Sequence, residues 1–200
     1  MKTTILIIHG AGDRSYQIMT QKWVPYLQKS LGSGFEIVAP EMPHPKFPMY
    51  SKWKATIQKT LLKIEGPVIL IGHSLGGTIL LKYLTEEAVL NPVVGLYLVA
   101  SPYFSGERGW NYQDFFIHKD PGELLRQFPV YSYHSTDDQI VPVSHQGFYA
   151  NRIPSAVVRT LSGHGHEYSK KEFLEIIEDI KQHQRLDVGH SYGETGEDRP

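Results

Sequence analysis

The chain has 200 residues, of which 40% are hydrophobic and 20% charged, a length that suits one globular domain burying roughly 70% of its unfolded surface. Its formal net charge of −1, without a cluster of Lys and Arg, argues against nucleic acid or an acidic membrane surface as the main partner. The absence of cysteine excludes disulfides, thiolate nucleophiles and cysteine-ligated zinc.

The N-terminal stretch MKTTILIIHGAGDR contains a lysine followed by a short apolar run. This run ends too soon for a signal peptide. No other stretch approaches the roughly 20 apolar residues that a membrane-spanning helix needs. We therefore expect a soluble cytoplasmic protein that does not bind membranes, and we interpret the run as a first strand.

Six short apolar runs are typical of strands buried on both faces of a sheet. They lie at residues 3–8, 35–39, 67–71, 95–99, 130–134 and 156–160. Stretches with helical spacing of apolar residues lie between and after them, at about 17–30, 50–64, 75–89, 143–152 and 169–184. This alternation predicts an α/β fold with a mainly parallel sheet of about six strands and helices on both faces.

Three segments interrupt this alternation. Residues 40–48 carry four prolines and predict an extended loop, and residues 101–128 form a long connection rich in aromatic side chains. Residues 185–200 have no apolar periodicity, which predicts a flexible tail after a single domain at residues 1–184.

The sequence GHSLGG at residues 72–77 follows the third predicted strand and opens a predicted helix. In an open parallel sheet, ligands bind beyond the carboxyl ends of the strands. G-x-S-x-G between a strand and a helix is the nucleophile elbow, in which Gly72 and Gly76 occupy crowded positions beside a strained serine. Ser74 is therefore the candidate nucleophile, although a serine in a Gly-rich turn can also simply cap a helix.

The same signature occurs again as GHSYG at residues 189–193, where Ser191 holds the central position. HQRLDV precedes this copy and GETGEDRP follows it, and neither predicts the strand or the helix that an elbow requires. We therefore interpret Ser191 as a solvated serine of the tail.

Serine needs a base, and a histidine oriented by a carboxylate is the usual arrangement, in the chain order serine, acid, histidine. STDDQIVP follows the fifth predicted strand and SGHGHEY follows the sixth. Asp138 is preferred over Asp137, because neighbouring side chains diverge and one aspartate can serve as a cap. His164 is preferred over His166, because it follows the strand directly. The His-x-His pair lacks companion ligands, so we expect no metal and no other cofactor.

Two further parts of an active site can be assigned. The backbone N–H groups of Leu75 and of Ala11, in the HGAG loop after the first strand, are candidates for an oxyanion hole. In the connection at 101–128, aromatic side chains either pack against the sheet or roof an apolar acyl site for small or medium acyl groups. The pocket candidates are Tyr103, Phe104, Trp110 and Phe115.

The chain resembles the small α/β-hydrolase family of retinoblastoma-binding-protein-9-like and YdeN-like serine hydrolases. The resemblance runs from about residue 3 to 180 and rests on IIHG, the MPHP run, GHSLGG, STDDQIVP and the final GH. It implies a fold without a large cap domain. The family pattern D-x-x-[VL]-P falls on Asp138 and its G-H on His164, so the resemblance implies a triad of Ser74, Asp138 and His164. A cysteine-containing retinoblastoma-recognition motif is absent, and we infer no such partner.

These residues predict a hydrolase that cleaves a small-molecule ester or related acyl compound through an acyl-enzyme. Two alternatives remain at this stage. An acyltransferase would use the same residues with an acceptor other than water, and a binding or scaffold protein would keep the fold with little chemistry.

Overall fold

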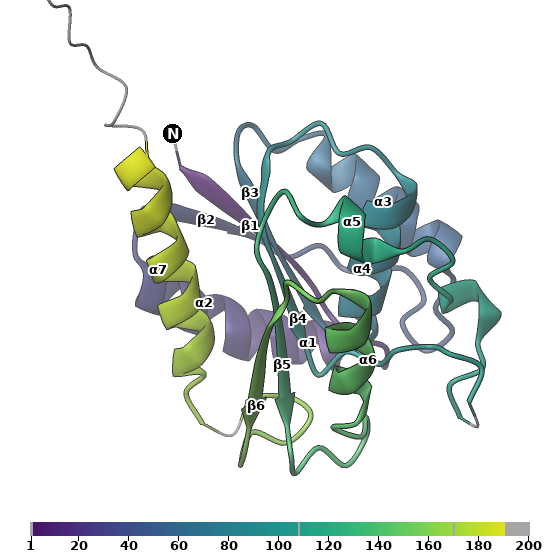
Figure 1. Ribbon diagram of the computed structural model, residues 1–200. Coiled ribbons are helices and arrows are strands. Elements are labelled where there is room, and N and C mark those ends of the chain that lie inside the picture. The colour runs from purple at the N-terminus through teal and green to yellow at the C-terminus, as the bar shows by residue number, and fades with distance from the viewer. Residues whose placement is uncertain (1, 108, 170, 191–200) are drawn as a thin grey trace, which may run out of the picture.

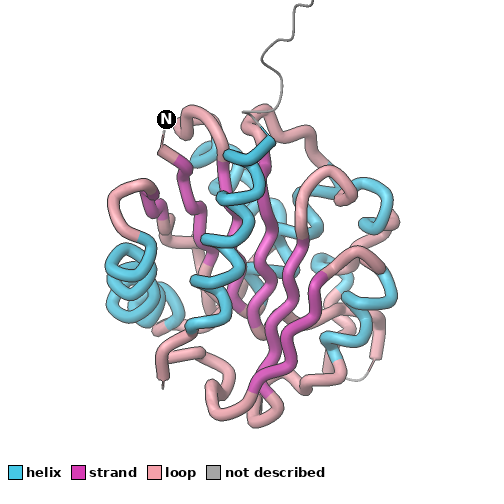
Figure 2. Tube along the Cα trace, turned by 60° about the vertical axis from the view of Figure 1, so that its left-hand side comes forward, coloured by secondary structure: helices cyan, strands magenta, loops and turns pink. Residues whose placement is uncertain are grey.

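The computed structural model describes residues 2–107, 109–169 and 171–190, and a sheet of six strands runs through its centre (Figures 1 and 2). The strands are β1 (Thr3–Ile8), β2 (Phe35–Val38), β3 (Val68–His73), β4 (Val93–Val99), β5 (Val130–Ser135) and β6 (Val157–Leu161). All six predicted strands are therefore confirmed, with ends that differ by at most two residues.

The strand order is β2-β1-β3-β4-β5-β6, and every neighbouring pair is parallel. The chain reverses its direction of travel across the sheet between β1 and β3, because β2 lies on one side of β1 and all later strands lie on the other. Such a switch point leaves a crevice at the carboxyl ends of the two strands, where open α/β sheets bind ligands. Ser74 directly follows β3 at this point.

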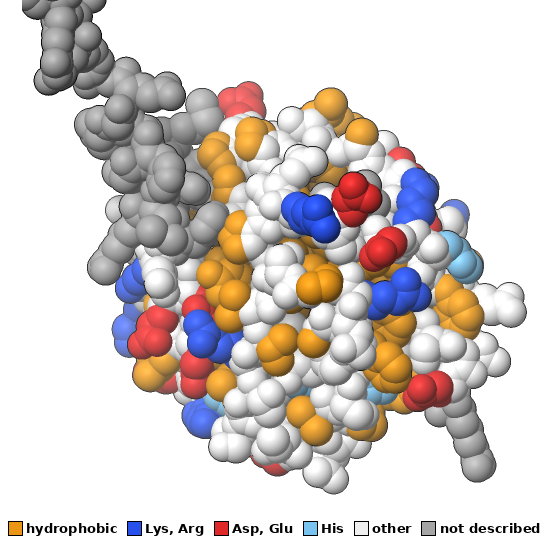
Figure 3. Space-filling view, viewed as in Figure 1, with side chains coloured by type: hydrophobic (Ala, Val, Ile, Leu, Met, Phe, Trp, Pro, Cys, Tyr) orange, Lys and Arg blue, Asp and Glu red, His pale blue; other side chains and the backbone are white. Residues whose placement is uncertain are grey.

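Helices cover both faces of the sheet (Figure 1). From the same side, the space-filling view shows hydrophobic, basic and acidic side chains interspersed over the surface (Figure 3). On one face, α1 (Ser15–Ile18), a π-helical turn at Met19–Trp23 and α2 (Val24–Leu31) are joined by α7 (Leu174–His190). The other face carries the remaining helices, and a 3-10 turn at Gln113–Phe115 lies in the connection after β4. These helices are α3 (Tyr50–Leu61), α4 (Leu75–Glu86), α5 (Pro121–Leu124) and α6 (His145–Arg152).

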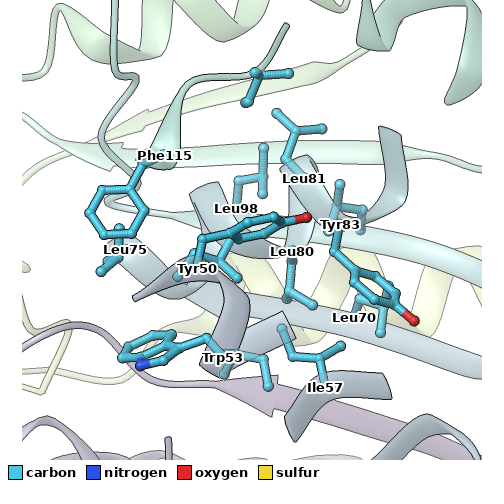
Figure 4. Close-up of a cluster of buried hydrophobic side chains, with 14 of the residues drawn as sticks. Tyr50, Trp53, Ile57, Leu70, Leu75, Leu80, Leu81, Tyr83, Leu98 and Phe115 are labelled. Atoms are coloured by element: carbon cyan, nitrogen blue, oxygen red, sulfur yellow. The ribbon is translucent and has the colours of Figure 1, made fainter. Parts of the chain in front are cut away.

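The helix that follows Ser74, α4, lies in the middle of the second face, and ten of its twelve residues are buried. It packs between β3 and α3, and Figure 4 shows Trp53 and Tyr50 of α3 beside the leucines of α4 and the sheet. A helix that is apolar on all sides is typical of a buried position. The start of α4, and with it Ser74, is therefore fixed to the core.

On the opposite face, a buried carboxylate ties α7 to the sheet. Asp179 of α7 is 3% exposed and accepts hydrogen bonds from the Tyr133 hydroxyl at 2.7 Å and from the Arg159 guanidinium at 2.7 and 3.2 Å. Burial and the bond to Asp179 raise the pKa of Tyr133, so the phenol remains a donor. This arrangement links α7 to both β5 and β6.

Two expectations are corrected. The last strand, β6, is largely exposed and not buried on both faces, because it is the edge strand with β5 on only one side. The helix α7 continues to His190, so the expected tail from residue 185 does not begin there. Residues 191–200, including Ser191, lie outside the described part of the chain.

Replacing Asp179 with Ala should lower the free energy of unfolding by about 2–4 kcal/mol, because the buried Tyr133 hydroxyl and the Arg159 guanidinium lose their acceptor. Denaturant unfolding measures this loss. The neighbouring exposed residue offers a matched control, and Glu178→Ala should change stability by less than about 0.5 kcal/mol. Equal effects of the two substitutions would contradict the anchoring role of Asp179.

Candidate active site

Ser74 occupies a strained turn between β3 and α4. Its backbone has φ 52° and ψ −128°, a conformation that non-glycine residues rarely adopt. Its N–H donates to the Val99 carbonyl at 2.8 Å, which ties the turn to the end of β4. The strand, the strained serine and the buried helix together are the nucleophile-elbow geometry that the sequence predicts.

Glycines allow this turn to lie against the sheet. A Cβ on Gly72 would overlap the backbone of Gly77, and a Cβ on Gly76 would overlap the carbonyl oxygen of Ile8 at the end of β1. A Cβ on Gly10 would lie 2.8 Å from the Cβ of Ser74. The loop after β1 and the elbow after β3 therefore touch directly, and neither side has room for a methyl group.

Asp138 lies in the loop after β5, and its carboxylate is fully enclosed. One oxygen, Oδ1, accepts from the N–H groups of Ile140 at 2.8 Å and Val141 at 2.9 Å. The other, Oδ2, lies 2.8 Å from Nδ1 of His166 and 3.3 Å from Nε2 of His134. Burial opposes ionisation, but the hydrogen bonds from these two histidines and the backbone outweigh it and hold the pKa of Asp138 well below its usual range.

The histidine paired with Asp138 is His166. Because the carboxylate is the acceptor, Nδ1 of His166 carries the proton, which leaves Nε2 of the neutral ring free to accept one. His166 and Ser74 line the same cavity. The structure therefore brings together a serine, an ionised aspartate and a histidine oriented by it.

His164, the histidine preferred from the sequence, lies elsewhere. Its ring is 1% exposed, stacks on Tyr168 at a centroid distance of 4.8 Å and contacts Phe173 at 5.5 Å. Among the residues that the structure describes, neither ring nitrogen has a hydrogen-bond partner, and the ring does not line the cavity that contains Ser74. The expected pairing of Asp138 with His164 is thus wrong, because the turn at 163–165 buries the first ring of the His-x-His pair.

Asp137 holds that turn in place. Its Oδ1 accepts from the N–H groups of Gly163 at 2.9 Å and Gly165 at 3.2 Å, and also from the Ser135 hydroxyl. These hydrogen bonds lower the pKa of Asp137, and the bond from the Ser135 hydroxyl has the largest effect. The two adjacent aspartates therefore have separate partners: Asp138 contacts the His166 ring, and Asp137 contacts the backbone that leads to it.

His73, the residue before the elbow serine, supports His166 from the opposite side. Its Nε2–H donates to the His166 carbonyl at 2.8 Å, and the two rings lie 5.0 Å apart. Burial, together with the nearby His166, lowers the pKa of His73 to about 3, so its ring stays neutral at ordinary pH. The sequence did not indicate this role, since the residue before the serine in G-x-S-x-G is variable and carries no fixed chemistry.

The two expected oxyanion donors also border the cavity. Ala11 and Leu75 both line it, and neither backbone N–H has a hydrogen-bond partner within the part of the chain that the structure describes. The loop carrying Ala11 is held by His9, whose Nδ1–H donates to the Gly10 carbonyl at 2.7 Å. Two free N–H donors beside a strained serine are suited to stabilise the negative charge that develops on a substrate carbonyl oxygen.

The cavity has a volume of about 1040 Å³ and is predominantly apolar. Of the expected pocket residues, Phe104, Trp110 and Phe115 line it. Tyr103 does not, because its ring packs against Phe148 and Tyr149, both at 5.5 Å. The sequence also missed the proline-rich loop, whose residues 44 and 46–49 form another wall of the cavity.

Neither a metal site nor a membrane span is found in the described residues. No group of three or more metal-ligating side chains occurs within 2–107, 109–169 and 171–190. Over the same ranges, none of the helices has the length and apolar character needed to span a bilayer.

Known proteins are similar to this chain in sequence and in fold. A family model described as serine hydrolase matches residues 5–181. The chain is 28% identical over 187 residues to the protein YdeN of Bacillus subtilis, an alignment covering 90% of this chain and 95% of YdeN. The crystal structure of the ydeN gene product has a TM-score of 0.74 at 20% identity and covers 92% of this chain and 100% of that one.

A more distant structure is that of Est1E from Butyrivibrio proteoclasticus with ferulic acid bound. Its TM-score is 0.64 at 14% identity, with 94% of this chain and 90% of that chain covered. At these identities the structural likeness shows a common α/β-hydrolase fold.

The buried neutral His73 should make stability depend on pH. Its pKa is about 3 in the folded protein and roughly 6.5 when unfolded, so below pH 6.5 the unfolded chain binds a proton that the folded chain does not. Its stabilising contribution is complete above pH 6.5 and should fall by about 2–3 kcal/mol between pH 7 and 4.5.

Denaturant unfolding of His73→Gln at pH 7 and 4.5 tests this expectation, since glutamine keeps a donor for the His166 carbonyl but does not titrate. The loss of stability on acidification should be smaller in this variant than in the original protein. His118→Gln, at an exposed histidine, should leave the loss unchanged. The same loss in His73→Gln would show that His73 already binds a proton in the fold.

Proposed function

The chain belongs to the serine hydrolase family, and we propose that it hydrolyses carboxylic esters or related acyl compounds with a triad of Ser74, His166 and Asp138. The observation that supports this most directly is the 2.8 Å hydrogen bond between Asp138 and His166 beside the cavity that also contains Ser74. His166 thus replaces His164 in the triad predicted from the sequence.

The proposed reaction begins with the Ser74 hydroxyl. Nε2 of His166 accepts its proton while Oγ forms a bond to the acyl carbon, and the carbonyl oxygen becomes negatively charged. The N–H groups of Ala11 and Leu75 stabilise this charge. His166 then returns the proton to the departing alcohol, which leaves an acyl group on Ser74. Water, deprotonated by His166, releases the acid and restores the serine.

Asp138 contributes by keeping its charge. Three hydrogen-bond donors and the nearby His134 ring surround its carboxylate and hold its pKa low, so it remains ionised while His166 carries the extra proton. It also fixes which nitrogen of His166 faces the serine. This role requires the carboxylate to stabilise the imidazolium without taking its proton.

Two features of the site weigh against the alternative of a binding or scaffold protein. Ser74 holds a strained backbone conformation that costs roughly 1–3 kcal/mol. The N–H groups of Ala11 and Leu75 have no partner in the described structure, and both residues border the cavity beside Ser74. Acyl transfer would use the same residues and differ only in the acceptor.

Active-serine labelling and ester hydrolysis distinguish the two histidines. Ser74→Ala should abolish labelling by a fluorophosphonate, and His166→Ala should lower kcat by at least about 1,000-fold. His164→Phe, which keeps a ring beside Tyr168, should retain activity within about tenfold if its unfolding temperature shows that it folds.

Ser191→Ala is the control for GHSYG, the second copy of the G-x-S-x-G signature, and this variant should label normally. A folded His164→Phe variant as inactive as His166→Ala would contradict the assignment of the base. Labelling that persists in Ser74→Ala and disappears in Ser191→Ala would contradict the nucleophile.

The adjacent aspartates should differ in their effects. Asp138→Asn removes the charge and turns a donor toward His166 Nδ1, so kcat should fall by about 10³–10⁴-fold. Asp137→Asn keeps one oxygen for the N–H groups of Gly163 and Gly165, so kcat should fall by about tenfold or less. Steady-state kinetics of both variants measure the difference, and a larger loss in Asp137→Asn would refute the acid assignment.

A further inference from the structure

Large apolar side chains remain exposed around the mouth of the cavity. Phe47 is 79% exposed, Tyr112 and Ile140 are each 63% exposed, and Met49 is 45% exposed. All four line the cavity that contains Ser74. They come from three separate segments: the proline-rich loop, the connection after β4 and the loop after Asp138. We call these four residues the apolar rim.

The segment carrying Phe47 and Met49 is held in place by its backbone. The Pro45 carbonyl accepts from Gly12 N–H at 2.8 Å, and Phe47 N–H donates to the His44 carbonyl at 2.9 Å. Lys46 forms an ion pair with Asp13 at 2.6 Å. The exposure of Phe47 is therefore a feature of a loop whose backbone is held in place, and this backbone keeps the residue at the mouth of the cavity.

Inside the rim, aromatic side chains form a continuous wall. Phe104 contacts Trp110 at 5.7 Å, Tyr112 at 6.1 Å and Phe115 at 5.1 Å between ring centroids. The segment is anchored to the helices behind it, because Asp114 accepts from Tyr50 N–H at 2.6 Å. The carbonyl of Phe116 accepts a hydrogen bond from the buried Lys82 ammonium, also at 2.6 Å.

Several polar groups of the cavity are already bonded within the protein, and its charged side chains balance. The Ser15 hydroxyl donates to the Ala11 carbonyl, and His73 donates to the His166 carbonyl. The Lys and Glu residues of the lining are Lys46, which is paired with Asp13, and Glu167. One cation and one anion give no excess charge for an ionic substrate. A charged substrate group placed against the aromatic wall would lose water without gaining a partner.

We infer that the substrate is a neutral ester with a bulky apolar group, which occupies the aromatic wall and covers the apolar rim. This inference rests on the proposed function and adds the substrate class. It differs from the small or medium acyl group expected from the sequence, because about 1040 Å³ matches the volume of sites for drug-sized ligands. The exposed rim side chains are the surface that such a group would remove from water.

Two ester series test this inference, each kept below the concentration at which it aggregates. One varies the acyl chain of p-nitrophenyl esters from acetate to octanoate, and the other varies the alcohol of acetate esters from ethanol to octanol. In at least one of the two series, kcat/KM should rise roughly two- to fourfold per added methylene until the cavity and rim are filled. Replacing the terminal methyl group of the longest substrate with a carboxylate should remove most of this gain.

Substitutions at the rim locate the effect. Phe47→Ser with Tyr112→Ser should lower the ratio of kcat/KM for the longest and shortest esters by about tenfold or more. Leu62→Ser with Leu90→Ser is the matched control. These leucines are 69% and 86% exposed and do not line the cavity, so the ratio should stay the same.

Other outcomes overturn the inference. They are a fastest reaction with the shortest ester in both series, a chain-length gain that the rim substitutions do not reduce, a preference for the carboxylate-bearing ester, or no hydrolysis of any ester. Fluorophosphonate labelling separates this failure from that of the proposed function. Labelling at Ser74 without a chain-length preference would contradict only the inferred substrate class. Absence of labelling would contradict the proposed function as well.

Discussion

The direct contact between the loop after β1 and the elbow after β3 is the constraint on which the site depends. Gly76 lies against the carbonyl of Ile8, and Gly10 lies against Ser74, with no room for a Cβ at either glycine. This contact brings the start of α4 onto the end of β1. As a result, the N–H groups of Ala11 and Leu75 and the hydroxyl of Ser74 border one cavity. The core around α4 keeps the strained serine from relaxing.

Histidine provides the second half of the site, and its support is distributed over several strands. The His166 ring is bound by Asp138 from the loop after β5. Its carbonyl is bound by His73 at the end of β3, and Asp137 binds the turn before it. A loop that follows the exposed edge strand is thus connected to the centre of the sheet. These contacts position His166 beyond β6, although β6 itself contributes little to the core.

The cavity is built differently from the reacting centre. Its walls include the connections after β2 and β4. Carbonyls in these connections bind Gly12 and Lys82, and the Asp114 carboxylate binds the N–H of Tyr50. Loops on a rigid scaffold commonly carry specificity while strand ends carry chemistry. Here the scaffold holds the loops firmly enough that apolar side chains such as Phe47 stay exposed in the free protein. The inferred substrate preference therefore rests on residues that lie outside the elbow.

By itself, the sequence determined the order of elements, the parallel sheet and the position of Ser74, because apolar runs and glycine spacing are local signals. It also favoured Asp138 within an Asp-Asp pair. Only the tertiary structure decided between His164 and His166, since both follow a glycine and differ by the direction in which a tight turn points each ring. His164 packs against Tyr168 and Phe173, and His166 binds the carboxylate of Asp138, which lies 28 residues earlier in the chain. No periodicity records such contacts, because they depend on how the loops after β5 and β6 meet in space.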